Sequence, residues 1–311
     1  MPTSRRQFLR QTAFSAAAAI TASAQLRSAE KSPRSRRPIG FSLYGMKSLP
    51  VIDALNHCKR IGYENVELCL MKDFPTELGK FSPAEQKQVQ AHLRSTGLDL
   101  SSLLVHINLV QPDQKPALEV IKGASEVART LDERRPPLIE TVTGGKADEW
   151  DATKDRVAAH LRTWAETAAA GGTRIAIKAH YGHVVNSPDR ILWLYRKVNH
   201  PGLTLTYDYS HYQAEGFELE PTLRAVIPHT GFIHMKDLVV GEKPAKYLLV
   251  GQGKIDYVKY FRVLDELKYR GPILVEVSAQ IHRLPGYQPI PTAEKCYAFL
   301  SAARDRALRQ S

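Results

Sequence analysis

The chain has 311 residues, with 43 Lys and Arg against 32 Asp and Glu, which gives a formal net charge of +11. Hydrophobic residues make up 43% and charged residues 24%, proportions that are ordinary for a soluble globular protein. This composition excludes a disordered chain, a collagen-like fibre and a multi-span membrane protein. The three cysteines are too few and too scattered for a disulfide framework or a cysteine-based zinc module.

The N-terminus predicts an export signal. Arg5 and Arg6 precede a Phe-Leu pair and an uncharged, alanine-rich stretch, a pattern typical of a twin-arginine signal peptide. Ala22-Ser23-Ala24 supplies a small-x-small cleavage site, so we expect a signal peptide over residues 1–24 and a periplasmic or secreted protein. The apolar stretch is too short for a spanning helix, so no permanent membrane anchor is expected. A disordered basic tail is the alternative.

Residues 25–38 form a basic linker between the signal and the predicted fold. Eight basic residues and one acidic residue precede Pro38, which leaves a net charge of +4 on residues 38–311. A run of this kind is usually a solvated tail rather than a binding site. The excess charge is therefore a weak indication of a polyanion partner, and we expect no nucleic-acid partner.

Short β-branched runs alternate with amphipathic helical stretches over residues 39–311. The predicted strands cover 39–44, 65–70, 100–107, 138–143, 174–180, 203–209, 232–237 and 273–278. The clearest predicted helices cover 51–61, 83–95, 117–131, 154–170 and 257–269. Eight βα units over about 270 residues predict one (β/α)8 TIM barrel. A doubly wound open sheet is the alternative, but the first βα turn lacks a glycine-rich dinucleotide fingerprint.

The candidate site lies on predicted strands five to eight, because TIM barrels carry their chemistry at the C-terminal strand ends. Lys178 and His180 share one face of strand five, and His234 and Lys236 share one face of strand seven. Asp208 ends strand six, and Glu276 stands in strand eight. Asp, His and Glu on three neighbouring strands suit a divalent cation such as Mn, Co, Zn or Mg.

Each of the three residues also has a structural interpretation. Asp208 can cap a loop or pair with Lys236, and His234 can be a buried, hydrogen-bonded histidine. Glu276 stands in an otherwise apolar strand, where an unpaired carboxylate would be costly to bury, so a cationic partner or a function is favoured. The presence of all three on consecutive strands favours a site.

Four motifs carry a resemblance to a known family: Asp208-x-x-His211, His234-x-Lys236-Asp237, the loop from Gly251 to Asp256, and Val275-Glu276. With them, residues 39–311 resemble the xylose isomerase-like TIM barrel superfamily, which includes sugar isomerases, sugar-phosphate and ketose 3-epimerases, inosose dehydratases and endonuclease IV. The resemblance implies that Asp208, His234 and Glu276 are metal ligands and that His211 contacts the substrate.

The chain departs from this family on strand five. Where the epimerases carry a metal-binding Glu, usually in Glu-x-His, this chain has Lys178-Ala179-His180. A protonated lysine is not a ligand and repels a divalent ion. His180 can replace the missing ligand, Lys178 can displace the metal altogether, or the site can have lost its activity. The first outcome is favoured, because His180 and His183 are additional ligand candidates.

The resemblance implies an exported sugar isomerase or epimerase that removes a proton alpha to the carbonyl of a sugar or keto-sugar. Glu276 and Lys178 are then the catalytic residues, and the substrate-binding residues are His211, Lys236 and His183. The expected metal ligands are Asp208, His234, Glu276 and His180. A one-base lyase or dehydratase and a non-catalytic sugar-binding barrel are the alternatives, and a homo-oligomer is compatible with the sequence. DNA repair is disfavoured, because strands one to four offer few ligands for the endonuclease IV metal cluster.

Four further residues have open roles. Glu140 lies well before the end of its strand, a position that favours an ion pair inside the barrel over catalysis. Tyr44, Glu67 and His106 lie near the ends of strands one to three, where they can line a sugar pocket or serve the structure.

Overall fold

The computed structural model describes residues 37–310. The predicted signal peptide and most of the basic linker lie outside the described residues. Within 37–310, no helix has both the length and the apolar character needed to cross a bilayer.

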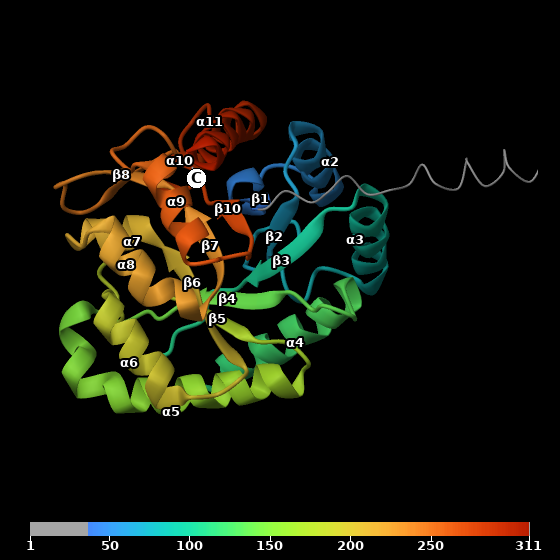
Figure 1. Cartoon of the computed structure of the whole chain (residues 1–311). Coiled ribbons are helices and arrows are strands. Elements are labelled where there is room, and N and C mark those ends of the chain that lie inside the picture. Colours follow the sequence, from blue (N-terminus) through green and yellow to red (C-terminus); the bar gives the residue numbers. More distant parts are fainter. Residues whose placement is uncertain (1–36, 311) are drawn as a thin grey trace, which may run out of the picture. The chain divides into compact units, whose positions relative to one another are not determined.

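Eight parallel strands close into a barrel, with the order β1-β10-β7-β6-β5-β4-β3-β2 around it (Figure 1). The strands are β1 (Ile39–Ser42), β2 (Asn65–Cys69), β3 (Asp99–Leu104), β4 (Leu138–Val142), β5 (Ile175–Lys178), β6 (Leu203–Asp208), β7 (Thr230–Met235) and β10 (Ile273–Val275). This closure confirms the predicted TIM barrel.

Helices surround the barrel on its outside (Figure 1). They are α2 (Val51–Ile61), α3 (Pro83–Thr96), α4 (Lys115–Leu131), α5 (Trp150–Ala170), α6 (Pro188–Val198), α7 (Tyr209–Ala214), α8 (Leu219–Val226), α9 (Tyr257–Glu266), α10 (Ala279–His282) and α11 (Pro289–Arg309). Short 3-10 turns are η1 (Leu43–Met46), η2 (Ala147–Glu149) and η3 (Ile227–His229).

Local sequence signals explain where helices begin and end. In α3 the Ser82 hydroxyl accepts from the Glu85 amide, and the Glu85 carboxylate accepts from the Ser82 amide, which satisfies two free N–H groups of the first turn. The helix ends at Gly97, whose φ of +70° suits a residue without a Cβ. Ser187 and Asp256 cap α6 and α9, as their positions predict, through side-chain oxygens that accept from the amides of Arg190 and Lys259.

The barrel interior is layered along its axis. Ala176, Phe232 and Leu274 form one buried apolar cluster with Leu138 packed against it. Because side chains alternate along a strand, the residue two positions further on points to the same side. Above the apolar cluster this rule places three polar residues, Lys178, His234 and Glu276. The apolar layer therefore forms the floor of a polar site.

Seven of the eight barrel strands are shorter than predicted, and β5 and β10 are shortened most, by three residues each. Strand β5 ends at Lys178, because the His180 amide donates to the Val185 carbonyl and turns the chain back on itself. Strand β10 ends at Val275, and Ser278 caps α10 instead of continuing the strand.

The chain after β7 forms an antiparallel hairpin that the sequence pattern does not predict. It is made of β8 (Asp237–Val239) and β9 (Lys246–Leu248).

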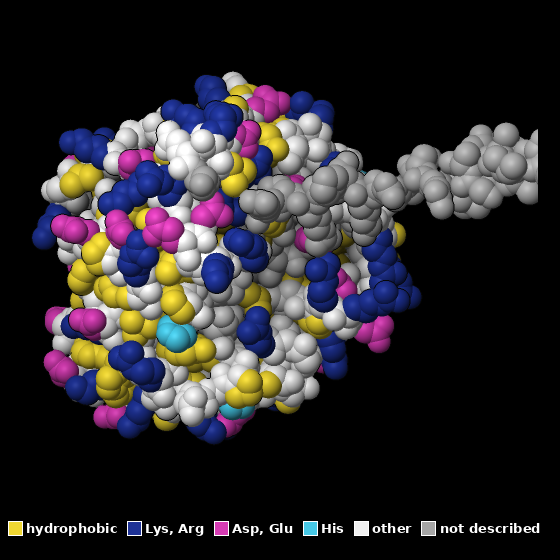
Figure 2. Space-filling view, viewed as in Figure 1, with side chains coloured by type: hydrophobic (Ala, Val, Ile, Leu, Met, Phe, Trp, Pro, Cys, Tyr) yellow, Lys and Arg dark blue, Asp and Glu magenta, His cyan; other side chains and the backbone are white. Residues whose placement is uncertain are grey.

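The surface carries charges of both signs. On the face seen in Figure 2, Lys and Arg side chains are interspersed with Asp and Glu side chains. Some of them form exposed ion pairs, such as Arg224 with Glu220 and Glu266. Exposed pairs of this kind each contribute little to stability, typically less than about 1 kcal/mol.

Candidate functional site

The C-terminal ends of β5, β6, β7 and β10 bring the predicted site residues together. Asp208 is in register with His234 across the β6–β7 pair, so their side chains lie at the same height. Lys178 is the last residue of β5, and Glu276 directly follows β10. All four side chains are buried; Glu276 is the most accessible of them, with 8% of its surface exposed.

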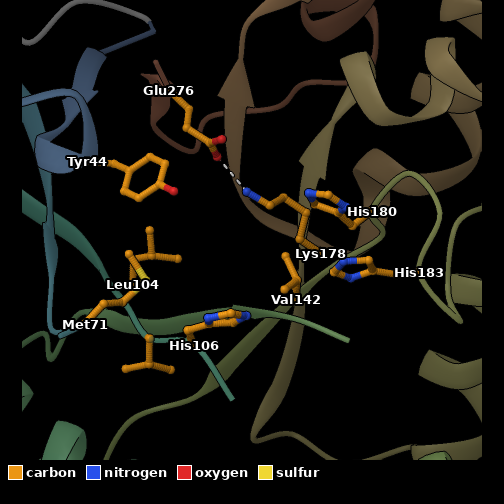
Figure 3. A pocket seen from close by; sticks show the side chains of 10 residues that line it. Tyr44, Met71, Leu104, His106, Val142, Lys178, His180, His183 and Glu276 are labelled. Atoms are coloured by element: carbon orange, nitrogen blue, oxygen red, sulfur yellow. Dashed lines mark hydrogen bonds and ion pairs between the residues drawn. The ribbon is translucent and has the colours of Figure 1, made fainter. Parts of the chain in front are cut away.

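Lys178 occupies the centre of this group. Its Nζ lies 2.6 Å from Glu276 Oε2 (Figure 3). The same nitrogen lies 3.3 Å from Glu140 Oε1 and 3.0 Å from His234 Nδ1. Burial by itself would lower the pKa of Lys178, but the charges of Glu140, Glu276 and Asp208 outweigh burial and hold that pKa well above its ordinary value. Lys178 is therefore an ammonium ion. The contact with Glu140 confirms the predicted ion pair inside the barrel.

Lys236 is a second ammonium on the other side of Glu276. It donates to Asp208 Oδ2, lies 3.0 Å from Glu276 Oε1 and lies 3.2 Å from His211 Nε2. The Asp208 carboxylate also accepts from the Ser210 hydroxyl at 2.6 Å. Asp208 thus has both structural roles considered above, the ion pair and the loop cap.

The Glu276 carboxylate is bound through both of its oxygens, by Lys178 and by Lys236. Burial would raise the pKa of Glu276, but Lys178, Lys236 and His234 together lower it well below its ordinary value. This carboxylate is therefore ionised at neutral pH.

His234 joins the site to a deeper carboxylate. Its Nδ1 lies 2.7 Å from Glu276 Oε2, and its Nε2 lies 3.2 Å from Glu67 Oε1. Glu67 also accepts from the hydroxyls of Ser42 and Ser102, each at 2.6 Å. Burial and the Lys178 ammonium lower the pKa of His234, but Glu67 and Glu276 outweigh them and raise it to about 9, which favours the protonated ring between the two carboxylates.

Asp208, His234 and Glu276 by themselves form a group that could hold a metal ion, since they offer three ligand atoms within 4.8 Å of one another. The surrounding charges do not fit a divalent ion. Two ammonium groups occupy the carboxylate oxygens, and one of them, Lys178 Nζ, also lies 3.0 Å from His234 Nδ1. The donor set as a whole suits ammonium groups in place of the ion.

A cavity of about 210 Å³ opens beside Glu276 and Lys178 (Figure 3). This volume corresponds to roughly seven water molecules, which suits a small polar ligand. Its lining residues are Tyr44, Met71, Leu104, Val105, His106, Val142, Lys178, His180, His183 and Glu276. Glu276 is the only carboxylate among these residues, all of which belong to the described part of the chain.

Three histidines stack beside the cavity. The His180 ring lies 4.1 Å from that of His183 and 3.9 Å from that of His211, measured between centroids. Burial, together with neighbouring histidines and lysines, lowers the pKa of all three, to about 4 for His183, so these rings are neutral. They are therefore hydrogen-bonding and stacking groups at neutral pH, and none is a cation.

The other predicted site residues differ in whether they line the cavity. His180 lies outside the group of potential metal ligands, because β5 ends before it; its Nδ1 lies 2.9 Å from the Tyr181 carbonyl. His183 lines the cavity, as do Tyr44 and His106. His211 and Lys236 are buried beside it and do not line it.

Tyr247 is a site residue that no sequence pattern indicated. Its hydroxyl lies 2.8 Å from His211 Nδ1, and its ring faces the Lys236 ammonium at 5.3 Å. Tyr247 stands in β9, part of a hairpin that no sequence signal places over the barrel mouth. The hydrogen bonds from Ser42 and Ser102 to Glu67 were also not predicted, because they depend on the register of three neighbouring strands.

Comparisons with known proteins agree with this architecture. The chain is 26% identical over 243 residues to Escherichia coli (strain K12) SgbU, provisionally named an L-ribulose-5-phosphate 3-epimerase, and the match covers 74% of this chain and 85% of SgbU. It is 27% identical over 172 residues to the inosose dehydratase of Yersinia enterocolitica, covering 50% of this chain and 56% of that enzyme.

A solved structure shows the same fold. The IOLI protein, crystallised with a bound zinc atom, superposes with a TM-score of 0.70 at 18% identity, covering 85% of this chain and 98% of IOLI. The sequence profile of the family described as "Xylose isomerase-like TIM barrel" matches residues 55–298, more than half of the chain. The chain therefore belongs to the xylose isomerase-like TIM barrel family.

Proposed function

We propose that this chain is an enzyme that removes the proton alpha to the carbonyl of a sugar or keto-sugar, with Glu276 as the base. One observation carries the proposal: Glu276, the only carboxylate among the described residues that line the cavity, is held between two lysine ammonium groups. The names of the two relatives reported above, an L-ribulose-5-phosphate 3-epimerase and an inosose dehydratase, refer to substrates of this kind, which supports a sugar or keto-sugar as the ligand.

In the proposed reaction the substrate's C–H bond breaks, its proton moves to Glu276, and the electron pair remains as an enediolate. The negative charge develops on the former carbonyl oxygen, where fixed cationic donors stabilise it most effectively. Lys178 is the only lysine or arginine among the described residues that line the cavity, so we assign it as the cationic donor to that oxygen. When the oxygen accepts a hydrogen bond from Lys178, the hydrogen bond from Lys178 to Glu276 weakens. The Glu276 carboxylate then becomes a stronger base.

We propose that Lys178 acts here in place of a divalent ion. In the resemblance described above, the metal of this family supplies charge that stabilises the enediolate. In this chain Lys178 and Lys236 both pair with Glu276, and Lys236 also pairs with Asp208. A Schiff-base role for Lys178 is disfavoured, because a nucleophilic amine must lose its proton and the adjacent carboxylates retain it.

Elimination is the second candidate. A two-base epimerisation needs a proton carrier on each face of the substrate carbon, and Glu276 is the only carboxylate among the described residues that line the cavity. A one-base reaction, in which a hydroxyl or another substituent beta to the carbonyl leaves after proton removal, needs only Glu276 and a proton donor. This arrangement favours a dehydratase or lyase over a symmetrical epimerase.

Hydrogen–deuterium exchange tests the proposal without knowledge of the product. L-ribulose 5-phosphate and inosose are incubated with the protein in D2O, and the alpha-proton signals are followed by NMR. We expect exchange with at least one compound, and a loss of about 100-fold or more in Glu276→Gln. Glu119→Gln is the matched control, since Glu119 is 72% exposed on α4.

Two outcomes would contradict the proposal. Exchange at an unchanged rate in Glu276→Gln would remove Glu276 as the base. Binding of a sugar by the wild type without any exchange would favour the non-catalytic sugar-binding barrel.

Export is part of the same proposal. It rests on the Arg5-Arg6 pattern and on the cleavage site at Ala22-Ser23-Ala24, which lie outside the described residues. The proposed site of action is the periplasm or the exterior of the cell.

A further inference from the structure

A second hollow lies next to the catalytic cavity, between the segments that follow β1 and β10. It has a volume of about 330 Å³, and its lining residues are Gly45, Lys47, Ser48, His282, Arg283 and Tyr287. Both segments leave the C-terminal ends of their strands, so the hollow is at the same end of the barrel as Glu276. The Tyr287 hydroxyl donates to the Gly45 carbonyl at 2.8 Å and ties the two segments together.

All charged side chains in this lining are basic. Within residues 37–310, neither Lys47 nor Arg283 has an ion-pair partner; Lys47 Nζ lies 4.9 Å from the centroid of the Phe74 ring. The Nε2 atom of His282 is buried and has no hydrogen-bond partner among the described residues. Buried polar atoms are nearly always satisfied, so an orphaned nitrogen beside two unpaired cations indicates a missing acceptor.

The pKa of His282 is lowered by burial and lowered further by the charges of its basic neighbours, Arg283 and Lys47. Three nitrogen groups from two segments therefore converge, and no carboxylate stands in the lining to neutralise them. A group with several anionic oxygens would accept hydrogen bonds from all three.

Tyr44 stands between the hollow and the catalytic cavity. The Tyr44 ring packs edge-on against His282, with centroids 4.6 Å apart, and Tyr44 also lines the catalytic cavity next to Glu276 (Figure 3). A substrate that has its reacting carbon at Glu276 and extends past Tyr44 would place its far end group in the basic hollow.

We propose that this hollow binds an anionic end group of the substrate, a phosphate or a carboxylate, and so selects anionic sugars over neutral ones. That the anion is part of a substrate rests on the proposed function, whereas the affinity of the hollow for an anion does not. Lys47 and Arg283 supply the charge, and His282 and Ser48 supply further hydrogen bonds.

Calorimetric titration at constant ionic strength tests this, with inorganic phosphate in one arm and acetate in the other. We expect saturable binding of at least one anion, weakened about tenfold or more by Lys47→Met and by Arg283→Gln. Methionine keeps an unbranched chain that can still pack on Phe74. Lys87→Met is the matched control, because it removes the same charge from the exposed outer face of α3, and it should leave binding unchanged.

The two arms identify the anion, and a tenfold preference for phosphate or acetate decides between a sugar phosphate and a sugar acid. Absence of saturable binding in both arms, or equal weakening by Lys87→Met, would overturn the proposal. Glu276→Gln should still bind the anion. A wild type that binds either anion but exchanges no protons would refute the proposed function and leave this site standing, whereas proton exchange without saturable binding of either anion would refute only this site.

Discussion

Replacing Lys178 by glutamate tests whether an ammonium group occupies the position of a metal ion. The change introduces the carboxylate that the family resemblance places on strand five. It also removes the cation that lies 2.6 Å from Glu276 and 3.3 Å from Glu140. Without a bound cation, the new carboxylate faces several buried acids with only Lys236 and His234 to offset them.

The expected loss of stability is large. Removal of one partner from a buried ion pair typically costs about 3–5 kcal/mol. For a domain of this size each kcal/mol shifts Tm by about 2–4 °C, so the metal-free variant should melt roughly 6–20 °C below the wild type. A divalent ion at 100 times its Kd would return about 2.7 kcal/mol, or roughly 5–11 °C.

Thermal melting with and without MnCl2 or ZnCl2, together with metal analysis after dialysis, measures both effects. We expect Lys178→Glu to retain about one ion per chain and to be stabilised by it, whereas the wild type retains none. Lys178→Met should lose stability without gaining metal affinity, since methionine brings no oxygen ligand. Lys87→Glu repeats the charge change on the exposed face of α3 and should do neither. A wild type that holds one ion as tightly as Lys178→Glu would refute the reasoning.

Two further predictions concern pH and export. The pKa of His234 is raised to about 9, above its ordinary value of about 6.5, so its stabilising charge is complete below about pH 6.5 and is lost as the pH rises through 9. Urea unfolding should show a decrease on the order of 3 kcal/mol over this window, and His234→Gln should flatten the profile; equal slopes would contradict it. Replacing Arg5 and Arg6 by lysine should retain the protein in the cytoplasm, as measured by cell fractionation, and unimpaired export would disprove a twin-arginine signal.

Local patterns were sufficient to predict the barrel. Alternating β-branched runs and amphipathic stretches specify strands and helices through side-chain periodicity, and caps such as Ser187 and Asp256 mark helix starts through local hydrogen bonds. Each of these signals acts within a few residues, so it can be seen in the sequence. The strand ends were less well defined, because the turn at His180 depends on a hydrogen bond to Val185 rather than on residue type.

The sequence by itself also determined which chemical groups stand at the barrel mouth, since Lys178, Asp208, His234 and Glu276 follow from strand order. The tertiary structure decided how they are paired. Which oxygen accepts from Lys178, whether His180 reaches the centre, and where Tyr247 packs all depend on distances between segments far apart in the chain. The charge of each group depends on the same distances, because burial and neighbouring ions together set its pKa. For this reason only the folded barrel shows a carboxylate between two ammonium groups where the sequence predicted a metal ligand.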